Sequence, residues 1–264
     1  MEKFSCQAIV LDLRDYGEAD LIVSLFNPKL GRFQTIAKSA RKSKRRFVNK
    51  LEIFTLLYAV LRPSHTGLPL LEEAELINSF PRLRQDASLY AAATLVREFL
   101  IAAAHEGDSD PEMFFVSLWA LDSLDKAGKG WPCRAVTAQF LVRYFDCIGY
   151  RPELEHCQKC GTAMTAGFPW LFSAARGGIV CPSCAAGPGG ASQPGDSSGS
   201  RMIQPGTAKF LSSSLTVPLS HLPRLKITPA PLQEALNILW RYGNAVLGRE
   251  IVSWRLFWQL TGSR

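Results

Sequence analysis

The sequence predicts a multidomain α+β protein, in which an N-terminal five-stranded barrel precedes an α-helical domain that carries an inserted four-cysteine zinc-finger module. Three observations predict this organisation. Strand-like runs fill the first part of the chain, helical periodicity follows Pro81, and two Cys-x-x-Cys pairs lie between helical segments. The predicted domains are residues 1–80, residues 81–152 together with 204–264, and the insert 153–203.

Five runs of strand-forming residues occupy the first 80 residues. Turn-forming residues separate most of them, and loops of unequal length favour a small closed barrel. The best-known five-stranded case is the OB-fold, which commonly binds oligonucleotides; a small SH3-like barrel is the alternative. Because the last run is rich in Leu and Glu, a helix is an alternative to a strand there. The runs are Ser5–Arg14, Asp20–Phe26, Arg32–Ala37, Leu51–Leu61 and Leu68–Ile77.

Apolar residues at spacings of three and four predict five helices after Pro81. Asp110-Pro111 supplies an N-cap and a first-turn proline for the second helix, and Gly149 can end the third. The five predicted helices are Arg84–His105, Glu112–Leu124, Pro132–Ile148, Pro231–Leu247 and Glu250–Leu260.

The two cysteine pairs are Cys157 with Cys160 and Cys181 with Cys184, separated by 20 residues. Four thiolates at this spacing are typical of a tetrahedral Zn²⁺ site. Such a site has no open coordination position, so it stabilises a fold and does not activate water. The alternatives are a redox pair, unrelated thiols, or His156 as a substitute ligand.

The insert ends in AAGPGGASQPGDSSGS, a Gly, Ser and Pro composition that predicts a flexible linker. The chain opens without a signal-peptide pattern, and no apolar run approaches the roughly 18 residues of a membrane span. We therefore expect a soluble cytoplasmic protein without membrane contact. Its seven cysteines are better explained by metal binding and buried thiols than by disulfides, with Cys6, Cys133 and Cys147 in the core.

One basic segment, residues 38–50, holds the charge excess of the chain. The chain has 30 Lys and Arg, 23 Asp and Glu and a net charge of +7, so outside this segment 23 basic residues face 23 acidic ones. Nucleic-acid phosphate is the usual partner of such a cluster. The predicted binding residues are Lys38, Arg41, Lys42, Lys44, Arg45, Arg46 and Lys50.

Aromatic residues near this segment are candidate platforms for stacked bases: Tyr16, Phe33, Phe47 and Tyr58. Each is, however, better explained as a core residue. Because the segment offers no Asn or Gln spaced for reading base edges, we expect binding that does not depend on sequence.

No catalytic motif is present. The chain lacks a phosphate-binding loop, a G-x-S-x-G turn, an H-E-x-x-H pair and the zinc-deaminase signature. The sequence therefore predicts a protein that is not an enzyme, with an unrecognised zinc hydrolase as a minor alternative. Asp12, Asp15, Glu18 and Asp20 form an acidic cluster that is better explained by solvated turns than by a magnesium site.

Several strings carry a family resemblance. Gly17-Glu18-Ala19-Asp20 is followed by an apolar strand, a turn with Gly31 and a strand that runs into Lys38-Ser39-Ala40-Arg41-Lys42. Further along, FLVRYFDCIGYRPEL precedes the cysteine pairs. The sequence thereby resembles the RecO family of bacterial recombination mediators, in which Gly usually stands at the position of Ser39.

The resemblance implies an OB-fold, a helical domain and a zinc module in one chain. It implies binding of single- and double-stranded DNA, annealing of complementary strands, and, with RecR, assistance to RecA loading on DNA coated by single-stranded DNA-binding protein. The helical domain would contact the acidic C-terminal tail of that coating protein, with Arg143 as a candidate contact. The resemblance also implies that the protein associates with the nucleoid during repair. The alternative is a protein-interaction adaptor with weak, non-specific affinity for nucleic acid.

Overall fold

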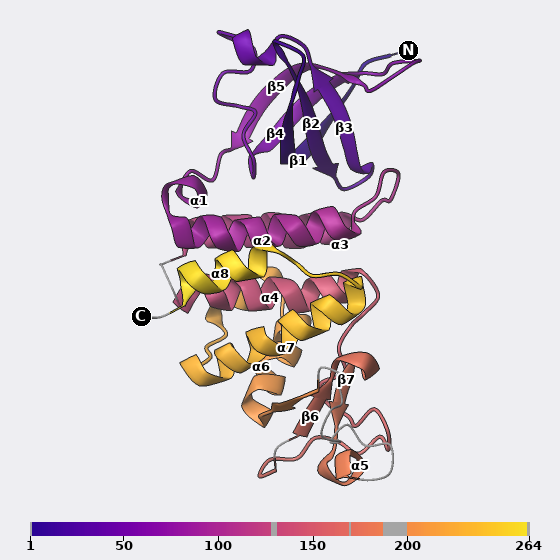
Figure 1. Ribbon diagram of the computed structural model, residues 1–264, viewed down its shortest axis with the longest axis vertical. Coiled ribbons are helices and arrows are strands. Elements are labelled where there is room, and N and C mark those ends of the chain that lie inside the picture. The colour runs from indigo at the N-terminus through magenta and orange to yellow at the C-terminus, as the bar shows by residue number, and fades with distance from the viewer. Residues whose placement is uncertain (1, 128–130, 169, 187–199, 263–264) are drawn as a thin grey trace. The chain divides into compact units, whose positions relative to one another are not determined.

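The computed structural model describes residues 2–127, 131–168, 170–186 and 200–262. The chain divides into two units, Met1–Lys126 and Ala127–Arg264 (Figure 1). The first unit combines a β-barrel with three helices. The division between units therefore comes well after the change of composition at Pro81, and the sequence-based domain boundaries stay a prediction.

The first unit contains the predicted five-stranded barrel, which is closed and OB-like. Neighbouring strands follow the order β1-β2-β3-β5-β4, and β4 pairs with β1 to close the barrel. All pairs are antiparallel except β3 with β5, which meet in parallel at Ile36 and Leu70. The strands are β1 Phe4–Tyr16, β2 Asp20–Asn27, β3 Gly31–Ala37, β4 Leu56–Arg62 and β5 Leu70–Asn78.

The structure corrects the start of the fourth predicted strand and settles the type of the fifth run. The fourth strand begins at Leu56, five residues after the predicted start, because Phe54 adopts a φ of 73° and Thr55 donates its hydroxyl to the Glu52 carbonyl at 2.6 Å. A turn therefore precedes the strand, although its residues are apolar. The fifth run, for which a helix was the alternative, is a strand.

The barrel interior is filled by inward-facing side chains of all five strands and of the segment between β3 and β4. Alternation along β3 buries Phe33, Thr35 and Ala37 while Gln34 and Ile36 stay partly exposed, as expected for a strand with one face in a core. Ala40, Phe47 and Leu51 belong to the same core, although they lie outside the strands.

Three helices complete the first unit: α1 Arg82–Gln85, α2 Ala87–Ala103 and α3 Pro111–Lys126. The helix predicted over 84–105 is present as α2, but its predicted start at Arg84 is wrong. Asp86 adopts an extended conformation, and its carboxylate accepts hydrogen bonds from the Ser88 and Leu89 backbone N–H groups at 2.9 and 3.2 Å. This N-cap separates α1 from α2, since the cap residue itself is not helical.

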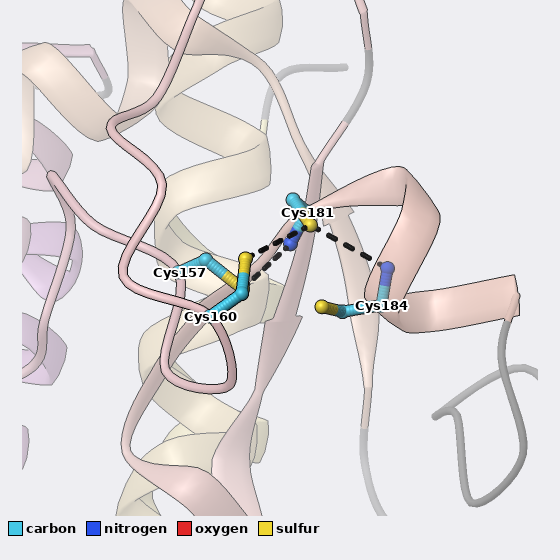
Figure 2. Close-up of side chains that lie close together, drawn as sticks. All are labelled: Cys157, Cys160, Cys181 and Cys184. Atoms are coloured by element: carbon cyan, nitrogen blue, oxygen red, sulfur yellow. Dashed lines mark hydrogen bonds between the residues drawn. The ribbon is translucent and has the colours of Figure 1, made fainter.

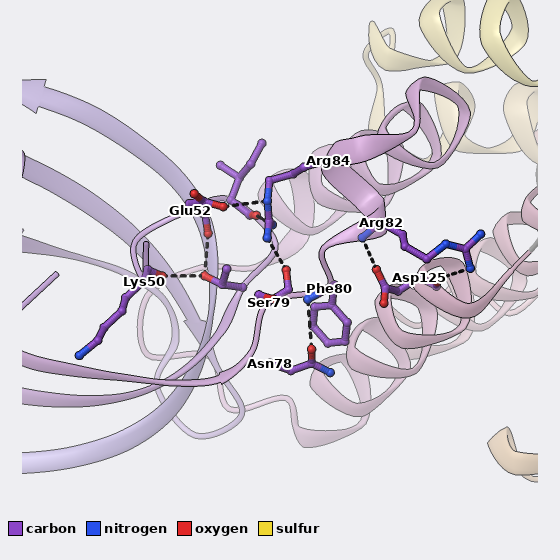
Figure 3. A network of polar contacts seen from close by, with 10 residues as sticks. Lys50, Glu52, Asn78, Ser79, Phe80, Arg82, Arg84 and Asp125 are labelled. Carbon is purple, nitrogen blue, oxygen red and sulfur yellow. Dashed lines mark hydrogen bonds and ion pairs between the residues drawn. The ribbon is translucent and has the colours of Figure 1, made fainter. Parts of the chain in front are cut away.

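Polar contacts fix the barrel to these helices. Arg84 forms an ion pair with Glu52 at 2.8 Å and donates to the carbonyls of Ile53 and Ser79 at 3.0 and 2.6 Å (Figure 3). Arg97 of α2 pairs with Asp12 of β1 at 2.6 Å. The barrel is thus held to α1 and α2 by charged hydrogen bonds.

Within its described residues, the second unit contains four longer helices and a small sheet. The helices are α4 Trp131–Cys147, α6 Pro205–Thr216, α7 Pro229–Leu247 and α8 Ser253–Thr261. Helix α6 was missed by the sequence analysis, because Ser212, Ser213 and Ser214 interrupt its apolar pattern. The sheet has the order β7-β6-β8, with β6 Trp170–Ser173, β7 Gly178–Val180 and β8 Arg201–Ile203, and the short helix α5 Pro182–Ala186 follows β7.

Tyr242 of α7 packs against both the helices and the small sheet. Its ring lies 4.8 Å from that of Phe145 and 5.5 Å from that of Phe172, and its hydroxyl donates to the Tyr150 carbonyl at 2.8 Å. The predicted Gly/Ser/Pro linker lies largely outside the described residues, which omit 187–199. In the part of the chain that is described, no helix has the length and apolar character needed to span a membrane.

Candidate nucleic-acid interface and metal centre

The basic segment 38–50 is anchored to the barrel by its apolar residues. Ala40, Phe47 and Leu51 are nearly buried in the barrel core, so the side chains between them face outward. Six of the seven predicted cations are exposed, and Lys50 is half-buried. The segment is therefore a fixed part of the barrel surface and presents a dense positive patch.

The turn between β1 and β2 holds the start of this segment. The Asp20 carboxylate accepts a hydrogen bond from the Ser39 N–H at 2.7 Å, and Arg41 pairs with Asp15 at 3.3 Å. Asp12 is engaged by Arg97 and by Arg14. Three of the four acids in the predicted cluster thus hold structure in place. Among the described residues they form no group suited to a metal ion.

Arg46 is fixed differently from its neighbours. Its guanidinium lies 4.4 Å from the centre of the Phe47 ring and donates to the Lys38 carbonyl. Within the described residues, the side chains of Lys42, Lys44 and Arg45 make no hydrogen bond or ion pair. These three cations remain available to an external anion.

The four candidate stacking residues divide into two pairs. Phe33 and Phe47 are only 6% and 4% exposed, so their interpretation as core residues is confirmed and they are not stacking platforms. Tyr16 and Tyr58 are 54% and 41% exposed. The sequence analysis did not single out Glu73 and Glu75, the outward-facing acids of β5 beside Tyr58. The alternation of polar and apolar residues along that strand was a signal for them.

The four cysteines of the insert come together in the second unit. Their sulfur atoms all lie within 4.8 Å of one another, and Cys160 Sγ is 3.7 Å from Cys181 Sγ (Figure 2). Ligands about 2.3 Å from a tetrahedral Zn²⁺ place sulfur atoms roughly 3.8 Å apart. The group therefore has the donor set and spacing of a four-thiolate metal site.

Local backbone geometry positions these thiols. Gly161 follows the first pair with a φ of 73°, a left-handed conformation that glycine adopts without strain. The β6–β7 hairpin is followed directly by Cys181, and Cys184 lies in α5. The Cys181 N–H donates to Cys157 Sγ at 3.3 Å.

Three of the thiols, those of Cys157, Cys160 and Cys184, differ in their tendency to ionise. Burial opposes ionisation of Cys157, but N–H groups of Cys181, Cys160 and Lys159 outweigh it and lower its pKa. Hydrogen bonds with Thr162 lower the pKa of Cys160 to about 6. Contact with Cys181 and Cys160 raises the pKa of Cys184 to about 12. A divalent cation at the centre would remove this conflict by stabilising all four thiolates.

Two further candidates have structural roles. His156 lies outside the four-cysteine group and faces Glu153 at 3.8 Å. Arg143, the candidate contact for an acidic tail, donates to the Ser214 carbonyl at 2.7 Å and to the Val217 carbonyl. It thereby satisfies carbonyl groups at the C-terminal end of α6, as a cation at that end of a helix does.

Comparison with known proteins covers both units. Residues 1–80 match the family model described as Recombination protein O N terminal, and residues 84–255 match Recombination protein O C terminal. DNA repair protein RecO of Syntrophobacter fumaroxidans is 36% identical over 184 residues, which are 69% of this chain and 71% of that protein. DNA repair protein RecO of Desulfosudis oleivorans is 32% identical over 261 residues, 96% of each chain. The protein of the same name from Desulfitobacterium hafniense is 29% identical over 259 residues, 97% of this chain and 89% of its own.

Proposed function

Because this chain belongs to the RecO family of DNA repair proteins, we propose that it is a non-enzymatic recombination mediator that binds single- and double-stranded DNA and anneals complementary strands. The observation that carries this proposal is the exposed set of cations on a segment anchored in the barrel core. Cations held at fixed positions neutralise phosphates at a low cost in side-chain and loop ordering.

The binding site is the basic segment, with Lys38, Arg41, Lys42, Lys44, Arg45, Arg46 and Lys50 on phosphates. Phosphate contacts fix a strand without reading its sequence. A strand held in this way keeps base edges free for pairing with a complement, as annealing requires.

The partners proposed beyond DNA follow from the family. With RecR, the protein assists RecA loading on DNA coated by single-stranded DNA-binding protein, whose acidic C-terminal tail the helical domain binds. Arg143 is not proposed as the acceptor of that tail, since its guanidinium is engaged by backbone carbonyls. The protein acts in the cytoplasm, at the nucleoid during repair.

Zn²⁺ is the proposed ion of the cysteine site, held by Cys157, Cys160, Cys181 and Cys184. Four thiolates leave no coordination position for water or substrate, so the ion supplies structure alone. This role separates the proposal from that of a zinc hydrolase.

Strand annealing tests the function directly, with complementary oligonucleotides coated beforehand by single-stranded DNA-binding protein. The wild-type chain should accelerate annealing, and replacing Arg41, Lys42, Arg45 and Arg46 by Ala should abolish the acceleration. The control variant replaces four exposed cations of the second unit, Arg224, Lys226, Arg249 and Arg255, and changes net charge equally. On the same oligonucleotides without the coating protein it should anneal like wild type, because this comparison does not depend on tail binding by the helical domain. An adaptor without DNA affinity would leave annealing unaccelerated while still binding the acidic tail peptide.

A further inference from the structure

A hollow of about 500 Å³ lies between the basic segment and the outer side of β4 and β5. Arg46 and Lys50 of the segment line it, together with Tyr58 of β4 and Glu73 and Glu75 of β5. All of these residues belong to the first unit. The hollow thus combines an aromatic ring with cations and carboxylates.

Strand register determines which side chains meet here. Tyr58 pairs with Glu75, and Val60 with Glu73, across the antiparallel β4–β5 ladder. Tyr58 and the two carboxylates are exposed, whereas Leu57 and Ala59 beside Tyr58 are buried in the core. The Tyr58 hydroxyl lies 2.6 Å from the Ser5 hydroxyl on β1, which restrains the ring. The ring and the acids therefore face the same side of the sheet.

The charged groups around the ring are largely free. Among the residues that the structure describes, neither Glu73 nor Glu75 makes a hydrogen bond or an ion pair through its carboxylate, and the Lys50 ammonium has no such partner. In Figure 3 the Lys50 side chain extends away from the network around its own carbonyl group. Opposite charges thus line one hollow without neutralising each other by direct contact.

This arrangement of charges and ring is suited to orienting a nucleotide. Arg46 and Lys50 attract a phosphate, whereas Glu73 and Glu75 repel it, so the phosphate lies on the side of the basic segment. A base stacked on Tyr58 would then have Glu73 and Glu75 beside its edge. A carboxylate accepts hydrogen bonds from exocyclic amino groups, which cytosine, adenine and guanine carry, whereas thymine presents carbonyl oxygens there.

We propose that this hollow is a base-binding subsite that favours bases with an amino group, such as cytosine, over thymine. The inference rests on the proposed DNA binding and refines it, because the phosphate contacts alone would not distinguish bases. A DNA strand held by the basic segment would then bind with a base preference that Glu73 and Glu75 of β5 determine.

The test uses the full chain and labelled oligomers of about ten nucleotides, within the ~4–16 nucleotide site size of an OB-fold. Fluorescence anisotropy at neutral pH compares oligo-dC with oligo-dT, which are both pyrimidine strands. Wild type should bind oligo-dC about fivefold more tightly, the size of one modest base-edge contact. The double variant Glu73→Gln and Glu75→Gln should reduce the ratio to about one, because a Gln amide can also donate to thymine O4.

Two controls separate the base preference from general effects. Glu106→Gln with Glu250→Gln removes the same charge at exposed positions outside the hollow and should keep the preference. Tyr58→Ala should weaken both oligomers about tenfold, whereas Tyr58→Phe keeps the ring and should bind like wild type.

The outcomes distinguish this inference from the proposed function. Equal binding of the two oligomers by wild type overturns the subsite and leaves DNA binding intact. A preference that persists in the double Gln variant also overturns it. Failure to bind either oligomer contradicts the proposed function itself, and with it the subsite.

Discussion

At the residue scale, Gly31 shows how one missing side chain permits the contact between barrel and helices. Its φ is 66°, and a Cβ atom at this position would lie 2.1 Å from the His105 carbonyl oxygen and 2.8 Å from that of Asp108. The neighbouring Arg32 N–H donates to the same His105 carbonyl at 3.1 Å. The β2–β3 turn and the end of α2 can therefore approach this closely only at a glycine.

Replacing Gly31 by Ala should lower the free energy of unfolding by about 2–5 kcal/mol, from left-handed backbone strain together with the clash. Gly17→Ala is the matched control, since Gly17 has a φ of 59° but a Cβ atom there would meet no other atom within 4 Å. It should lose only ~1–2 kcal/mol. Hydrogen exchange of β2 and β3 amides measures the free energy of unfolding of both variants. Equal losses of stability would show that the contact with His105 is unimportant.

Individual residues were predictable to different degrees. The four cysteines and the exposed cations follow from spacing and charge, because a metal site and a solvated cation each need a fixed chemistry. Phe33 and Phe47 were correctly favoured as core residues, but the sequence left a stacking platform open, since an aromatic residue beside a basic segment suits either role. Glu73 and Glu75 gain meaning only when β4 and β5 pair, which single-strand patterns do not specify.

Among the elements, the cysteine module depends least on its own apolar core and most on a bound metal. Its strands are short, with β6 at 4 residues and β7 and β8 at 3 each. A sheet of this size buries little apolar surface, and a bound metal would supply much of its folding free energy.

Cys157→Ser or Cys184→Ser should therefore release the metal and unfold residues 153–185, while the barrel persists. Metal analysis after dialysis and circular dichroism check the two effects. Cys133→Ser, a buried cysteine outside the group, is the control for loss of a thiol. Stoichiometric zinc in both ligand variants would contradict the four-ligand site.

Element boundaries were less predictable than element types. Apolar composition extended the fourth strand back to Leu51, whereas a positive φ at Phe54 ends any strand there. The predicted helix over 84–105 missed the cap at Asp86. Both errors have one cause, because local turns and caps depend on hydrogen bonds that an apolar pattern does not reveal.

At the scale of the whole molecule, the first unit is larger than the predicted barrel domain. Contacts of Arg84, Arg97 and Gly31 connect the barrel to residues after position 80. A fragment of residues 1–126 should therefore unfold more cooperatively, and at higher urea concentration, than a fragment of residues 1–80. Urea titrations followed by circular dichroism compare the two. Equal midpoints would instead support a domain boundary at residue 80.

The salt dependence of DNA binding tests the central claim, that the basic segment holds the phosphate backbone. If about five of its cations meet phosphates, the logarithm of the binding constant should fall with the logarithm of salt concentration at a slope of about −3.5 on single strands. Replacing Arg41, Lys42, Arg45 and Arg46 by Ala should reduce the magnitude of that slope by up to ~2.8. Ala at Arg224, Lys226, Arg249 and Arg255 should leave it unchanged. An unaltered slope in the first variant, or an equal loss in both, would contradict the assignment of DNA binding to residues 38–50.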